Sequence, residues 1–132
     1  MPRPIHFEIH SENPERAIAF YEGMFGWRFT KWDGPAPYWL VQTGDPGRPD
    51  EPGIDGGMMR RMGAGPADGA AVNAWVCTVG IASVDESVAS AQRLGGSIAL
   101  PKLPVPGVGW LSYVKDPDGN ILGLMQSDTS AR

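Results

Sequence analysis

Hydrophobic and polar residues alternate in the first patterned stretch of the chain, "IHFEIH". Three apolar residues would share one face of a strand and three polar residues the other, namely Ile5, Phe7 and Ile9 against His6, Glu8 and His10. The spacing then becomes helical, with Asn13 as N-cap, Pro14 at the first helical position and Gly26 after the last apolar residue. The pattern therefore predicts a strand followed by a helix.

The same order of elements is predicted twice. In the first half, strand-like runs follow the helix at residues 27–32, 38–43 and 55–60. The second half has a strand pattern at 74–81, a capping box "SVDE" that opens a helix, and strand patterns at 97–100, 110–115 and 120–126. The last two are joined by "DPDG", which favours a tight hairpin turn.

This repetition predicts the α+β class, with two βαβββ modules over about residues 1–66 and 72–128 in a single domain of residues 1–132. Each half is too small to bury both faces of its sheet, so the halves are expected to pack together into a curved sheet. Such packing favours an open cleft between them. A plain α+β sandwich with a filled core is the alternative.

Composition narrows the function classes. The chain of 132 residues has 42% hydrophobic residues and a net charge of −4, without a run of Lys or Arg, which argues against nucleic acid as a partner. No apolar run reaches the roughly 20 residues of a membrane span, and no signal segment is evident, so a cytoplasmic location is expected. The single cysteine, Cys77, excludes an intramolecular disulfide and is interpreted as a buried strand residue.

Three stretches carry a resemblance to a known superfamily: "HFEIHSENPERAIAFYEGMFGW", "VDESVASAQRLGG" with "PKLPVPGVGW" after it, and "YVKDPDGNILGLMQ". They resemble the vicinal oxygen chelate superfamily of glyoxalases, extradiol dioxygenases, and bleomycin- and fosfomycin-resistance proteins. More narrowly, the chain is similar to small bacterial glyoxalase-like proteins. The resemblance covers nearly the whole chain, and its motifs are specific for the fold but not for the reaction.

In metal-dependent members of this superfamily, four positions on four strands surround a divalent ion. The resemblance places these positions at His6, within Gly56–Met59, at Val76 and at Gly123. Only His6 carries a ligand, so no cofactor is expected, since catalytic metal sites normally use about three protein ligands. The alternative is a divalent metal (Zn, Ni, Fe or Mn) held by His6 and Glu8 with a ligand from another strand.

His6 and Glu8 are the candidate catalytic residues, because an imidazole beside a carboxylate can work as a general acid-base pair. Alternatively, the two form a buried hydrogen-bonded pair that only orders the cleft. Other residues are expected to line the cleft and contact a substrate, although aromatic and Met side chains are also ordinary core residues. They are His10 at the strand end, Trp39, Met58, Trp110, Tyr113 and Met125.

Three functions stay open at this stage. The first is binding of a small, apolar or aromatic molecule, as metal-free bleomycin-binding relatives do. The second is a lyase or dioxygenase of the glyoxalase or extradiol type that uses His6 and Glu8. The third is a module that binds a protein partner. The resemblance also implies a homodimer.

Overall fold

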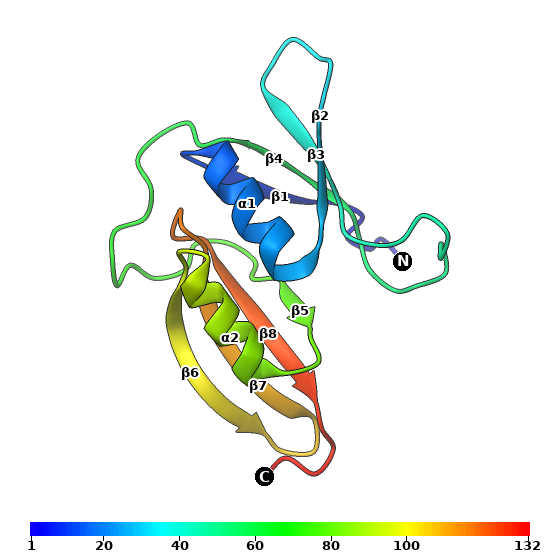
Figure 1. Cartoon of the computed structure of the whole chain (residues 1–132), viewed down its shortest axis with the longest axis vertical. Coiled ribbons are helices and arrows are strands. Elements are labelled where there is room, and N and C mark those ends of the chain that lie inside the picture. The colour runs from blue at the N-terminus through cyan, green and yellow to red at the C-terminus, as the bar shows by residue number, and fades with distance from the viewer. The chain divides into compact units, whose positions relative to one another are not determined.

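The computed structural model describes residues 1–132, and they divide into two compact units, residues 1–65 and 66–132 (Figure 1). The elements of the first unit are β1 (Phe7–Ser11), α1 (Pro14–Phe25), β2 (Arg28–Lys31), β3 (Tyr38–Gln42) and β4 (Gly56–Arg60). Those of the second are β5 (Thr78–Gly80), α2 (Val84–Arg93), β6 (Ser97–Val105), β7 (Gly109–Lys115) and β8 (Ile121–Ser127). The predicted α+β class with two βαβββ modules is confirmed.

Both units arrange their strands in the same way. The first sheet has the order β1-β4-β3-β2 and the second has the order β5-β8-β7-β6. In each, the strand before the helix pairs in parallel with the last strand of the unit, and the other pairs are antiparallel. The two units are therefore topological repeats.

The helix ends follow the capping signals of the sequence. The side chain of Asn13 accepts a hydrogen bond from the backbone N–H of Arg16 at 3.2 Å, and Gly26 ends α1 in the left-handed conformation with φ of 70°. In α2 the Ser83 hydroxyl accepts from the backbone N–H of Glu86, also at 3.2 Å. Neither helix is long and apolar enough to cross a membrane.

Each sheet buries one face against the helix of its own unit. In the first unit, Ala17 of α1 packs with Val41 and Met58 of the sheet, and Phe7 and Ile9 join this cluster. The apolar side of β1 thus lies toward the helix, as the alternation predicts. In the second unit most of the buried apolar residues come from α2, β7 and β8, namely Val84, Ala91, Val114, Leu122 and Leu124, and Ala131 after β8 is buried as well.

Two strand predictions in the second half were wrong in extent. The strand predicted at 74–81 shrinks to β5, in which Thr78, Val79 and Gly80 pair in register with β8. Trp75 before it is 92% exposed, and Cys77 is exposed and not the buried strand residue that was predicted. Conversely, β6 runs to residue 105 through two prolines, which an edge strand with register shifts tolerates.

The turn between β7 and β8 has the predicted tight form. One carboxylate oxygen of Asp116 accepts the backbone N–H groups of Asp118 and Asn120, each at 2.9 Å. Gly119 adopts a φ of 82°, which side chains disfavour. Local turn chemistry therefore sets the register of this hairpin.

Candidate functional site

The candidate site lies on the face of the first sheet that points away from α1, which we call the open face. Glu8 pairs in register with Gly57, and Gly57 with Leu40 on β3. This row alternates with the helix-facing row that contains Met58, so its side chains project to the open face. His6, Glu8 and His10 are all exposed there.

Four side chains on the open face form a continuous hydrogen-bonded chain, which we call the polar chain: His6, Tyr38, Glu8 and His10. The Nε2 atom of His6 lies 2.9 Å from the Tyr38 hydroxyl, and this hydroxyl donates to Oε2 of Glu8 at 3.3 Å. The other carboxylate oxygen of Glu8 lies 2.8 Å from Nε2 of His10. Tyr38 therefore stands between the two predicted catalytic residues, which do not form the buried direct pair that the sequence left open.

The phenol of Tyr38 is held in its protonated form. Burial raises the pKa of Tyr38 above its ordinary value, and the negative charge of Glu8 and the hydrogen bond to it raise it further. A protonated phenol can donate to a carboxylate, whereas a phenolate would repel it. At neutral pH the polar chain thus contains a neutral donor next to Glu8.

A glycine makes room for this phenol. A Cβ atom at Gly57 would lie 1.7 Å from the Tyr38 hydroxyl oxygen, so no side chain fits there while the ring keeps its place. Its neighbour Gly56 is constrained on the helix-facing side, where a Cβ would lie 2.5 Å from the backbone oxygen of Phe7. Gly57 therefore leaves space on the open face, and Gly56 leaves space on the helix-facing side.

Two of the predicted substrate contacts in the first unit lie on the helix-facing side. Met58 is fully buried in the core, and Trp39 packs against the same cluster. Neither side chain reaches the polar chain, so we leave both out of the candidate site. The hydrophobic pattern identified them correctly as apolar strand residues but did not distinguish the two faces of β3 and β4.

The predicted contacts of the second unit divide between the two faces of its sheet. The indole N–H of Trp110 donates to Asp128 at 3.1 Å, and Lys102, which pairs with Asp85 of α2, lies 4.9 Å from the centre of its ring. Trp110 therefore belongs to the helix side. Tyr113 and Met125 alternate with buried residues and lie on the opposite face, in register with Gly123 and Leu111.

The residues at the expected metal positions do not fit a metal. In the register of β1 and β4, Gly57 faces Glu8 as Gly123 faces Thr78, so Gly57 is the second position. A Cβ at Gly57 would collide with Tyr38, and one at Gly123 would lie 2.6 Å from Thr78 Oγ1. Val76 offers no donor atom, and no group of three or more His, Cys, Asp or Glu side chains is placed to hold an ion.

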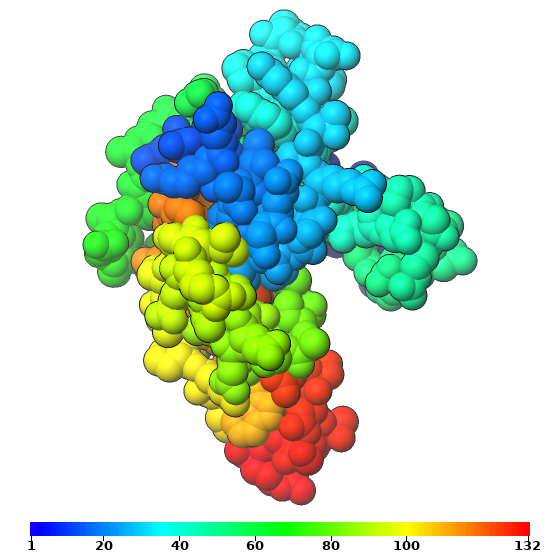
Figure 2. Space-filling model, viewed as in Figure 1, coloured from blue at the N-terminus to red at the C-terminus, as the bar shows by residue number.

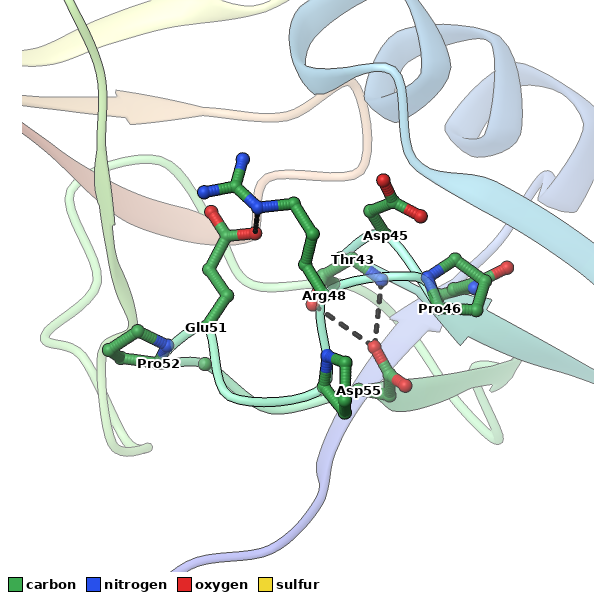
Figure 3. Close-up of a pocket in the computed structure, with 11 residues that line it drawn as sticks. Thr43, Asp45, Pro46, Arg48, Glu51, Pro52 and Asp55 are labelled. Atoms are coloured by element: carbon green, nitrogen blue, oxygen red, sulfur yellow. Dashed lines mark hydrogen bonds and ion pairs between the residues drawn. The ribbon is translucent and has the colours of Figure 1, made fainter.

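A concave region of the first unit is formed by the loop from residue 42 to residue 55, with a volume of about 310 Å³ (Figure 3). This loop stands out as a lobe of its unit in Figure 2. Its polar groups bind one another: Asp55 accepts from the backbone N–H of Thr43 at 2.8 Å, and Asp45 from that of Gly47 at 2.8 Å. Arg48 lies 3.8 Å from Glu51. The hydrogen bonds of this hollow therefore stabilise the loop itself.

Tyr38 is the site residue that the sequence interpretation missed. It opens β3 in "YWLVQ", where only Trp39 was predicted to contact a substrate. The available signal was alternation, because Trp39 and Val41 share the apolar side and Tyr38 must then lie opposite. Its contact with His6 depends on the pairing of β3 with β4, which the sequence does not specify.

Comparisons with known proteins identify the fold. No protein-family model and no curated protein matches the sequence. Among solved structures, the fosfomycin resistance protein FosX from Listeria monocytogenes matches with a TM-score of 0.72 and 18% identity, over 97% of this chain and 94% of that one. This chain has the fold of the vicinal oxygen chelate superfamily.

Two further solved structures share this superfamily fold over nearly their whole length. TioX from Micromonospora sp. ML1 matches with a TM-score of 0.64 and 18% identity, over 96% of this chain and 100% of that one. A glyoxalase/bleomycin resistance protein/dioxygenase family enzyme from Burkholderia phytofirmans PsJN matches with a TM-score of 0.68 and 13% identity, over 93% and 97%. A variant of the Listeria protein was solved with Mn(II) and 1S,2S-dihydroxypropylphosphonic acid.

Proposed function

We propose that the protein binds a small apolar or aromatic molecule at the open face of the first sheet, where His6 and Glu8 act on it as acid-base groups. The polar chain is the observation that carries this proposal. It places two imidazoles, a phenol and a carboxylate within hydrogen-bond distance of one another on an exposed face. Such groups can move a proton to or from a bound molecule.

Apolar surface beside the polar chain suits the body of such a ligand. Leu40, in register with Gly57, is 48% exposed, and Trp32 is 45% exposed. The Trp32 ring stands edge-on to Tyr38, with ring centres 6.3 Å apart. An aromatic ligand gains from such surfaces by burial and ring contacts. His10 completes the polar side as a contact for the ligand through its position next to Glu8.

The proposed chemistry does not use a metal. The donor set at the expected positions supports this, since Gly57, Val76 and Gly123 carry no ligand atoms in their side chains. Elemental analysis of protein purified without a chelator or a His-tag tests it. We expect metal well below one ion per chain. A near-stoichiometric divalent ion would instead support the metal-dependent lyase or dioxygenase alternative, with His6 and Glu8 as ligands.

A thermal-shift screen with aromatic and dicarbonyl compounds tests the binding function. We expect at least one compound to raise the melting temperature of the wild-type protein and of Thr78→Ala, the matched control at the position equivalent to Glu8. If a hit is turned over, Glu8→Gln should lower the rate by about 10²- to 10⁴-fold and spare binding. Unchanged turnover would remove Glu8 as a base.

The same screen distinguishes a binding site from a protein-partner module. Hits that bind His6→Ala as tightly as wild type would place the ligand elsewhere. If no compound of a broad library shifts the melting temperature, the partner-binding module is favoured. The proposal also includes a homodimer in the cytoplasm, and light scattering after size exclusion measures the mass of the particle directly.

A further inference from the structure

The hydrogen-bond geometry around Tyr38 determines which nitrogen of His6 carries a proton. A phenol has one proton, and an ionised carboxylate can only accept. When Tyr38 donates to Glu8, the 2.9 Å contact with His6 needs its proton from the imidazole. Nε2 of His6 is then the donor.

The opposite arrangement is unfavourable. If Tyr38 donated to His6, the phenol oxygen would face the Glu8 carboxylate at 3.3 Å with no proton between two electron-rich atoms. That repulsion is absent when all the protons point toward Glu8. His10 agrees with an arrangement in which the protons point toward Glu8, since its Nε2 lies 2.8 Å from the other carboxylate oxygen.

We propose that Tyr38 is the positioning residue of this site: it fixes His6 in the Nε2–H tautomer, so that Nδ1 is the atom of His6 that accepts a proton. This rests on the proposed function only where the ligand is concerned. A molecule acted on through Nδ1 must present a proton donor, such as an O–H group or an acidic C–H group. The proton would pass from the ligand to Nδ1 and leave an imidazolium, with the electron pair remaining on the ligand.

Gly57 contributes to the position of Tyr38, because it leaves room for the phenol. The Tyr38 hydroxyl occupies the space that a Cβ at position 57 would need. Replacing Gly57 by alanine must therefore displace the ring and break its contacts with His6 and Glu8, although Tyr38 itself is unchanged. The two variants Tyr38→Phe and Gly57→Ala should have the same effect on His6.

Nuclear magnetic resonance of the free protein tests the proposal, because the chain contains only two histidines. Long-range ¹H–¹⁵N correlations, recorded at a pH at which the spectra themselves show neutral rings, report the tautomer of each assigned histidine. In wild type we expect one His6 tautomer, with a slowly exchanging Hε2 proton and a nuclear Overhauser contact from it to the Tyr38 ring. Mixed tautomers, or a proton on Nδ1, would overturn the proposal.

The variants separate positioning from general stability. Tyr38→Phe and Gly57→Ala should both lose the slow Hε2 resonance and show mixed tautomers. Gly44→Ala, whose Cβ would meet nothing within 4 Å, should keep the wild-type spectrum. If Tyr38→Phe keeps the wild-type spectrum of His6, Tyr38 does not position His6. The measurement on the wild-type protein determines the tautomer even if Gly57→Ala does not fold.

No ligand is used in these spectra, so their outcome is independent of the compound screen. A screen without hits would remove the proposed function and leave the tautomer assignment intact. Conversely, a ligand that binds a protein with mixed His6 tautomers would support the function and refute the role of Tyr38.

Discussion

The two repeats have the same strand order, yet their open faces, which point away from α1 in the first sheet and from α2 in the second, differ in chemistry. Glu8 faces Gly57 in the first repeat, and Thr78 faces Gly123 at the equivalent place in the second. The first face carries the polar chain. The second carries Tyr113, Met125 and other apolar residues. The helix-facing residues maintain the shared topology by burial, which leaves the open faces free to differ.

The glycines show the same divergence in finer detail. At Gly57 the nearest atom to a Cβ would be a hydroxyl oxygen of Tyr38, and at Gly123 the Thr78 hydroxyl, with a ring carbon of Tyr113 at 3.1 Å. Both repeats thus fill a small position with groups from neighbouring strands. Only in the first repeat does that group connect histidines and a carboxylate.

Substitutions in the core should lower the free energy of unfolding most, and by similar amounts in the two repeats. Met58→Ala and Leu124→Ala each remove a fully buried side chain, which lowers the free energy of unfolding by about 3 kcal/mol. Glu8→Gln and Thr78→Ala, on the open faces, should change it by less than about 1 kcal/mol. Urea denaturation measures all four. A core-sized loss for Glu8→Gln would break the distinction between the two faces.

The second-largest difference is expected between the adjacent glycines of β4, in how far an alanine at each position lowers the stability of the protein. Gly56→Ala places a methyl group against the backbone and ring of Phe7, and overpacking of this kind costs about 2 kcal/mol. Gly57→Ala meets only the outer end of a side chain that can move, so it should cost less. Thermal melts of the two variants give the order. Equal losses would show that Tyr38 is as firmly held as the core.

The smallest effect concerns alkaline pH. Because the pKa of Tyr38 is raised in the folded state, the folded protein holds this proton more tightly than the unfolded chain does. Its contribution to stability is present below about pH 10, the ordinary tyrosine value, and is lost as pH rises through the folded value. Tyr38→Phe should flatten this part of the stability profile relative to wild type. Tyr113→Phe, the matched change in the second repeat, is the control.

Local signals predicted the elements well where one short segment contains all the information. The caps at Asn13 and Ser83 and the hairpin after Asp116 each depend on hydrogen bonds within a few residues. The strand at 74–81 failed because a strand exists only where a partner pairs with it, and β8 supplies three residues to β5. The strand predicted at 97–100 was too short, because the edge strand β6 continues through two prolines to residue 105.

The candidate site likewise contains residues that a local pattern predicts and one residue that depends on the pairing of distant strands. His6, Glu8 and His10 could be named from the sequence because strand alternation alone puts them on one face. The metal positions expected from the resemblance to the superfamily, at His6, within Gly56–Met59, at Val76 and at Gly123, stay a prediction. Tyr38 could not be named, because its hydroxyl reaches residues 30 and 32 positions away through the pairing of β3, β4 and β1.

By itself, the sequence of this protein determined the two βαβββ repeats, the helix ends and the polar stripe of the first strand, since each follows from periodicity or from contacts between near neighbours. Only the tertiary structure decided that Met58 lies in the core with Trp39 packed against it, and that Tyr38 links His6 to Glu8 above Gly57. The physical reason is register. Pairing between distant strands decides which side chains meet, and a shift of one residue would turn each of them to the other face.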